Sequence, residues 1–94
     1  MRRGVDAVAM LTRALTASAA GAGVALELGD GRSQAWASAT FEGERVQLTL
    51  LASGAGAEGW LAVLPECDLP LRGWYVADLT VRGERLEALV LRAG

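Results

Sequence analysis

Hydrophobic and polar residues alternate along most of the chain after residue 23, and segments that contain glycine interrupt the alternation. Alternation with a period of two is typical of strands that bury one face of a sheet. Before residue 21 the apolar residues instead recur every three or four positions, which is typical of a helix. The pattern predicts a helix at 5–20 and strands at 24–28, 34–42, 45–51, 60–64, 74–82 and 85–92.

These elements predict a single α+β domain over residues 1–94, in which one N-terminal helix packs on a five- or six-stranded antiparallel meander sheet. The main apolar stripe of the helix consists of Val5, Val8, Leu11, Leu15 and Ala19. Gly21 and Gly23 follow it and favour a helix end. A second, weaker apolar strip lies on the flank, as surface or as a partner contact, and consists of Met10, Ala14 and Ala17.

The first twenty residues also resemble a secretory signal peptide, because Ala17-Ser18-Ala19 offers small side chains at the place of a cleavage site. Asp6 and Arg13 interrupt the uncharged segment that such a signal needs, so we expect a helix of the folded domain instead. No apolar run approaches the ~20 residues that span a bilayer. We therefore expect a cytoplasmic protein without a membrane segment.

Two glycine-first turns set the predicted strand register. Phe41-Glu42-Gly43-Glu44-Arg45-Val46 returns as Val81-Arg82-Gly83-Glu84-Arg85-Leu86, 84 − 44 = 40 positions later. A two-residue loop with glycine first is the type II′ pattern. With Gly43-Glu44 as loop, the predicted pairs are Phe41–Val46, Ala39–Leu48 and Ala37–Leu50. With Gly83-Glu84 as loop, they are Val81–Leu86, Leu79–Ala88 and Ala77–Val90. The repeat is an internal duplication or a chance match around a common turn.

Asp30-Gly31 predicts a further hairpin of type I′. The pairs are then Leu28–Ser33, Leu26–Ala35 and Val24–Ala37, with Gly29 opposite Arg32. Both registers place the large apolar residues of these strands on one face, which we expect to be buried. The small side chains on the central strand of that face favour close packing of the helix across Ala35, Ala37 and Ala39.

Two glycine- or proline-containing segments are predicted to be irregular. Residues 52–59 are small and nearly uncharged, which indicates a connecting loop and lacks the P-loop pattern. Pro65 and Pro70 keep the segment between them out of a central strand.

Composition narrows the function classes. All nine basic residues are arginine, and Lys, Asn, Ile and His are absent, which indicates a GC-rich, bacterial genome. Net charge is −2 and the arginines are scattered, which argues against nucleic-acid binding through a basic stripe. Hydrophobic residues make up 52% of a short chain, and such chains often complete their burial by association.

Candidate chemistry is sparse. Without histidine the chain lacks the commonest general base and metal ligand, and Cys67 lies between two carboxylates that blunt a thiol's reactivity. We expect no cofactor, no metal and no enzymatic activity. The least favoured hypothesis is an enzyme that uses Asp78 with Arg45 or Arg85, since Asp78 is predicted mid-strand opposite Leu89.

The outward face of the sheet carries the main functional prediction. Trp36 is predicted to pair with Leu51, while Leu89 and Leu91 project the same way from the last strand. Contiguous apolar area on a surface marks a partner or ligand site. We expect a non-enzymatic domain that forms a homodimer or binds a protein partner there, with Asp78 nearby. The alternative is a small apolar ligand in a pocket between the helix and a curved sheet, near Trp36, Trp60 and Trp74.

Overall fold

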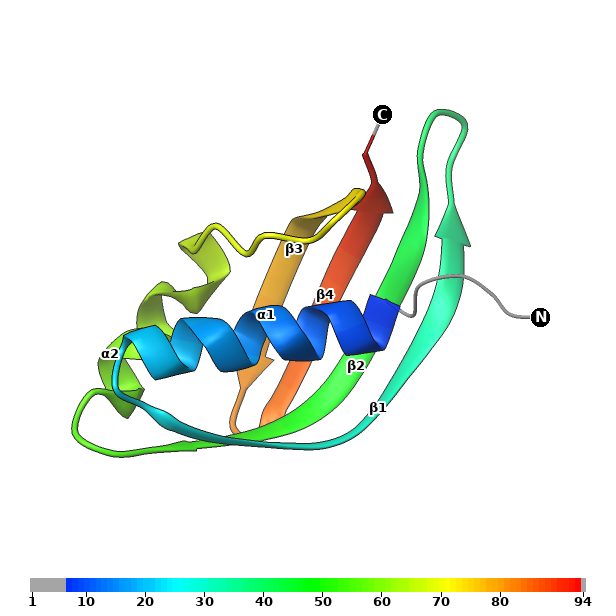
Figure 1. Ribbon diagram of the computed structural model, residues 1–94. Coiled ribbons are helices and arrows are strands. Elements are labelled where there is room, and N and C mark those ends of the chain that lie inside the picture. The colour runs from blue at the N-terminus through cyan, green and yellow to red at the C-terminus, as the bar shows by residue number, and fades with distance from the viewer. Residues whose placement is uncertain (1–6, 94) are drawn as a thin grey trace.

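A single long helix, α1, crosses one face of a four-stranded antiparallel sheet, and none of the described helices lies on the other face (Figure 1). The computed structural model describes residues 7–93. The elements are α1 (Ala7–Gly21), β1 (Ala25–Ala37), β2 (Glu42–Ser53), α2 (Ala57–Val63), the 3₁₀ turn η1 (Leu64–Glu66), β3 (Trp74–Arg82) and β4 (Arg85–Arg92). The strand order is β1-β2-β4-β3.

The α+β class and the N-terminal helix on an antiparallel sheet are confirmed, but the number and order of the strands are not. The sheet has four strands instead of five or six, and β2 pairs with β4, so the order is not that of a meander. The predicted strand at 60–64 is helical. Ala57, Trp60 and Leu64 are buried, and their spacing of three and four residues is that of a helix face.

The first hairpin turns earlier than predicted. Ala37 pairs with Glu42, and the turn between them is closed by the Ser38 amide, which donates to the Phe41 carbonyl at 2.8 Å. The Ser38 hydroxyl accepts a second hydrogen bond from the Phe41 amide at 3.2 Å. Serine hydroxyls stabilise turns in this way. Phe41 is therefore a turn residue with 47% of its surface exposed, and its predicted pairing with Val46 is wrong.

The predicted hairpin at Asp30-Gly31 is also wrong, because β1 continues through these residues as one strand. Leu28 pairs with Leu50 and Gly31 with Leu48, so two residues of β1 lie opposite Thr49 in a β-bulge. A Cβ atom at Gly29 would collide with the Thr49 hydroxyl. The bulge therefore leaves no room for a side chain opposite Thr49, and glycine fits there.

The second glycine-first turn is confirmed. Arg82 pairs with Arg85 and Leu79 with Ala88, and Gly83 has a φ of +57° as a type II′ turn requires. The predicted pair Ala77–Val90 is wrong, because a bulge between Val76 and Asp78 moves Val76 opposite Val90.

The core lies between α1, α2 and the inner face of the sheet. Its least exposed side chains are Leu11, Leu15, Val46, Leu64, Leu86 and Val90. Val24 and Leu48 both belong to it, as predicted, and so do Met10 and Ala14, which the sequence placed on the flank of α1. Val5 lies outside the described residues.

The helix packs closely against β1 at Gly31 and not at the predicted alanines. A Cβ atom at Gly31 would lie 2.8 Å from Cγ1 of Val8 on α1. Ala35 and Ala37 are exposed, because the hairpin arm that carries them extends beyond α1 (Figure 1), and Ala39 belongs to the turn. The sequence predicted that small residues on this strand would let the helix pack closely. The structure shows such packing at Gly31 instead of at the predicted alanines.

Candidate binding surface on the open face of the sheet

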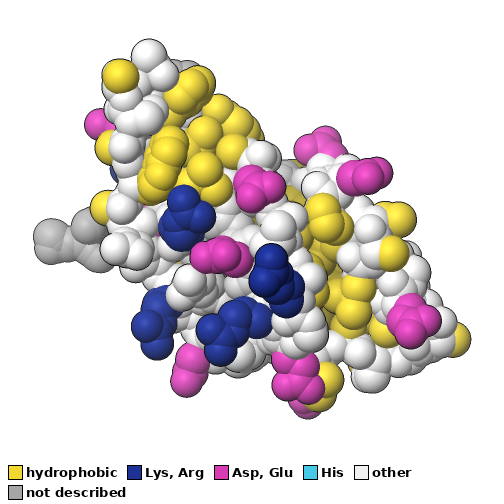
Figure 2. All heavy atoms as spheres, turned by 180° about the vertical axis from the view of Figure 1, so that it is seen from behind, with side chains coloured by type: hydrophobic (Ala, Val, Ile, Leu, Met, Phe, Trp, Pro, Cys, Tyr) yellow, Lys and Arg dark blue, Asp and Glu magenta, His cyan; other side chains and the backbone are white. Residues whose placement is uncertain are grey.

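The face of the sheet opposite α1, called the open face below, is built in rows because the three strand pairings align its outward residues. Figure 2 shows this face, with hydrophobic side chains gathered at the end of the β1–β2 hairpin (upper left) and arginines and carboxylates below them. The pairings define three successive rows across β1, β2, β4 and β3. They are Trp36–Gly43–Leu91–Tyr75, Gln34–Arg45–Leu89–Asp78 and Arg32–Gln47–Glu87–Thr80.

The row at the hairpin end, called the apolar row below, consists of Trp36, Gly43, Leu91 and Tyr75. Leu91 is only 6% exposed although it lies outside the core cluster under α1. A Cβ atom at Gly43 would collide with the Val90 carbonyl oxygen and lie 2.7 Å from Cδ2 of Leu91, so the Leu91 side chain lies over this glycine. Tyr75 remains 41% exposed. The row is thus a small second apolar cluster with an accessible aromatic edge.

The second row joins apolar and charged side chains. Leu89 lies between Arg45 on β2 and Asp78 on β3 and is half-buried. The predicted pairing of Asp78 with Leu89 is confirmed. Asp78 and Arg45 are both exposed and are two strands apart, with Leu89 between them. Asp78 therefore belongs to the rim of an open surface and not to a concave acid–base site.

The middle of the open face is polar. Nε2 of Gln47 donates a 2.9 Å hydrogen bond to Oε2 of Glu87, which fixes the half-buried carboxylate between β2 and β4. Arg32 flanks this pair, and Arg82 and Arg85 face each other across the next row. These three arginines are exposed and line two adjoining shallow hollows of about 340 and 330 Å³. Arg32 is far from Arg82 and Arg85 in the sequence, and the fold brings these three arginines to the same part of the open face.

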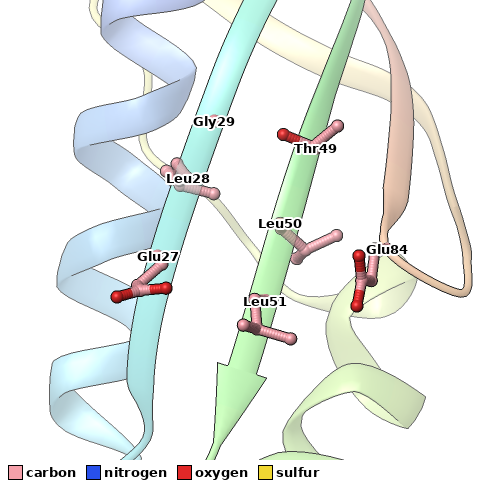
Figure 3. A pocket seen from close by; sticks show the side chains of 7 residues that line it. All are labelled: Glu27, Leu28, Gly29, Thr49, Leu50, Leu51 and Glu84. Carbon is pink, nitrogen blue, oxygen red and sulfur yellow. The ribbon is translucent and has the colours of Figure 1, made fainter.

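Leu51 does not join the apolar row. It pairs with Glu27 instead of Trp36, so the predicted Trp36–Leu51 pair is wrong. Leu51 lies on β2 between Glu27 of β1 and Glu84 of the β3–β4 turn, at a hollow of about 480 Å³ (Figure 3). The Leu50 amide donates to the Glu84 carbonyl at 2.8 Å and holds that turn against β2. Leu51 thus marks the opposite end of the sheet.

The three tryptophans do not line one pocket between helix and sheet. Trp60 is buried, and its Nε1 donates to the Ser18 hydroxyl of α1 at 3.0 Å. Trp74 is buried on the inner face under the Arg92 guanidinium, 4.8 Å from the ring centre. Trp36 and Trp74 share only a hollow of about 390 Å³ at the hairpin end. The space between α1 and the sheet is occupied by Leu11, Leu15 and their core neighbours.

Sequence reasoning placed Trp36, Leu89, Leu91 and Asp78 on the outward face, and the structure brings all four into adjoining rows. It missed Gly43 and Tyr75. Gly43 was assigned to a turn, and the bulge between Val76 and Asp78 reverses the side to which Tyr75 points.

Within residues 7–93 no group of three or more Asp, Glu, Cys or His side chains is arranged to hold a metal ion, and Cys67 is a half-buried free thiol. The same residues contain no helix that is long and apolar enough to cross a bilayer. Comparisons with protein-family models, curated proteins and solved structures gave no match.

Proposed function

We propose that this protein is a non-enzymatic domain that associates through the open face of its sheet, with a second copy of itself as the first partner. The same surface would serve a different protein if the domain works in a larger assembly. The reason is physical: contiguous apolar surface beside polar rows is the composition of a protein contact, with an apolar centre and a polar rim.

The observation that carries the proposal is the aromatic surface that stays accessible around Leu91 on the side of the sheet opposite α1, where Tyr75 is 41% exposed and Trp36 is half-buried. Leu91 is nearly as protected as the core leucines, yet what surrounds it are residues of its own sheet, including the exposed Tyr75. A third layer over this row would bury Tyr75 and the half-buried Trp36 as well. Tyrosine and tryptophan are the residue types that contribute most to protein interfaces.

The irregular edge strands of the sheet favour association through the open face over association by pairing of edge strands. Both edge strands, β1 and β3, contain a bulge, at Leu28–Gly31 and at Val76–Asp78. Bulges interrupt the row of backbone donors and acceptors that a neighbouring strand would need. The open face has no such interruption in its three rows.

The test is a mass measurement by light scattering at high micromolar concentration. We expect twice the 9.8 kDa of the chain for the wild type and a shift toward 9.8 kDa for Leu89→Arg, which places a second positive charge beside Arg45 in the middle of the surface. Val63→Arg is the matched control, because Val63 is a similarly apolar residue, 51% exposed on α2, which packs on the α1 side of the sheet. A wild type that stays monomeric at these concentrations, or an equal effect of both variants, refutes self-association through this face.

A further inference from the structure

We infer that two copies pack as a sandwich about a two-fold axis that runs parallel to the strands, between β2 and β4. This inference rests on the proposed self-association and specifies its geometry. Rotation about such an axis brings the two open faces together, lays β1 of one copy over β3 of the other, and keeps each row opposite itself. The order β1-β2-β4-β3 places the axis at the centre of the sheet.

The apolar row is self-complementary under this rotation. Trp36 on β1 lies over the partner's Tyr75 on β3, and Leu91 on β4 lies over the partner's Gly43 on β2. The row therefore places an aromatic ring over an aromatic ring at each side, and the two Leu91 side chains, each lying over Gly43 of its own chain, face each other in the middle. Aromatic pairs and close-packed complementary shapes are what stabilise the centre of protein interfaces.

The polar rows are also complementary. Asp30 of the β1 bulge lines the same hollow as Arg32 and Arg85 on the open face, at the level of the Arg82–Arg85 pair. The rotation therefore brings Asp30 toward the partner's Arg82. In the row above, Gln47 lies over the partner's Glu87, and in the next, Gln34 lies over the partner's Asp78. Each of these pairs combines a donor with a carboxylate.

A two-fold axis in the same plane but across the strands gives the opposite result. Through the third row it would place Arg32 over the partner's Arg32 and Glu87 over the partner's Glu87. It would also move the apolar row toward the end of the sheet where Leu51 lies between Glu27 and Glu84. Like charges in apposition select against an arrangement. Charge therefore favours the axis parallel to the strands over this axis across them.

Twisted sheets that pack face to face keep their strands within about 30° of each other. The pairs nearest the axis, such as Gln47 with the partner's Glu87, then remain opposed. The pairs at the corners, including Asp30 with the partner's Arg82, are displaced by several ångströms, which the long arginine side chain spans.

The decisive experiment exchanges the corner charges. Asp30→Arg alone puts arginine opposite the partner's Arg82 at both corner contacts of the dimer, and Arg82→Asp alone puts two aspartates together at each. We expect the dissociation constant of each variant to rise by roughly tenfold or more at low salt. In an equimolar mixture both corner contacts pair an arginine with an aspartate. We therefore expect the mixture to form a heterodimer, which native mass spectrometry separates from either homodimer by mass.

Substitutions of Gln34 provide a second test, which does not require the mixture. Because Gln34 lies over the partner's Asp78, Gln34→Arg is expected to tighten the dimer several-fold and Gln34→Glu to weaken it by a similar factor. Gln34 and Asp30 are both exposed, so circular dichroism is expected to show unchanged folding for these variants.

The outcomes separate this geometry from the proposed function. Weakened single variants with a recovered mixture, and opposite effects of the two Gln34 variants, support the axis parallel to the strands. A wild-type dimer that Leu89→Arg dissociates, but whose charge variants do not complement, refutes the axis and leaves the proposed surface standing. A monomeric wild type refutes both.

Discussion

The two faces of β4 show how differently the two sides of this sheet are built. Leu86 and Val90 point toward α1 and are fully buried, in a core where none of the described buried residues is polar or charged. Leu89 and Leu91 point the other way and share their surface with arginines and carboxylates from all four strands. The inner face thus has every neighbour it needs within one chain, whereas the outer face combines an apolar row with unburied charge.

This difference teaches which face specifies the fold and which specifies a contact. Apolar packing alone discriminates poorly between alternative orientations of two surfaces, whereas charge patterns discriminate well. The inner face does not need them, because chain connectivity already fixes α1 over it. In the proposed dimer no connectivity fixes how the two open faces meet, so their orientation would have to come from side chains such as Asp30, Arg82 and Glu87.

The largest expected effect compares two leucines of the same strand. Leu86→Ala removes a fully buried side chain from the core and is expected to lower the free energy of unfolding by about 2–5 kcal/mol. Leu89→Ala, on the open face, is expected to cost a single chain about 1 kcal/mol or less. Urea denaturation at low protein concentration measures both free energies of unfolding. Equal losses would show that the open face is as much a part of the folding core as the inner one.

The second comparison tests where α1 touches the sheet. Gly31→Leu places a side chain against Val8 of α1, and overpacking of this kind is expected to cost about 1–3 kcal/mol. Ala35→Leu adds a larger side chain to the same side of β1, but on the exposed arm, and is expected to change stability by about 0.5 kcal/mol at most. A thermal melt in which Ala35→Leu is the more damaging variant would contradict this placement of the helix.

The bulge that precedes Gly31 also shows how much of β1 could be predicted from the sequence. The apolar positions Leu26 and Leu28 and the later inward positions Ala35 and Ala37 are out of phase by one residue, so something between them must reverse the alternation. A two-residue hairpin does this, and so does a bulge in a continuous strand. The pattern therefore identified the correct inward face, but it could not distinguish a reversal of the chain from an extra residue.

The two copies of Gly-Glu-Arg teach the same lesson for turns. Gly83-Glu84 turns, whereas Gly43-Glu44 lies inside β2, since Ser38 closes the hairpin four residues earlier and Gly43 is needed for the approach of β4. Local turn preference is the same in both, and the difference comes from a strand that is distant in sequence. For the candidate surface, alternation along β4 was sufficient to find Leu89 and Leu91. The position of Leu51 depended on the turn and was missed.

A smaller effect concerns the attachment of α2, which completes the inner side of the sheet. The hydrogen bond from Trp60 to Ser18 joins α2 to α1 at 3.0 Å. Trp60→Phe and Ser18→Ala are each expected to cost about 1 kcal/mol for the lost bond, with a further loss for the smaller ring of phenylalanine. In a double-mutant cycle the two losses should not add, because either change removes the same interaction. Full additivity of the two free energies would show that this bond does not contribute to stability.

The smallest expected effect is a dependence of the melting temperature on protein concentration, which association through the open face would produce. If unfolding separates two copies, a tenfold increase in protein concentration above the dissociation constant stabilises each subunit by about 0.7 kcal/mol, which is half of RT ln 10. For a domain of this size that corresponds to a rise in melting temperature of about 3–6 °C. Leu89→Arg should abolish this dependence, whereas Val63→Arg should retain it, because α2 takes no part in the proposed contact. A melting temperature that is independent of concentration in the wild type would leave the apolar row without a third layer, and the contrast between the two faces would then be one of packing alone.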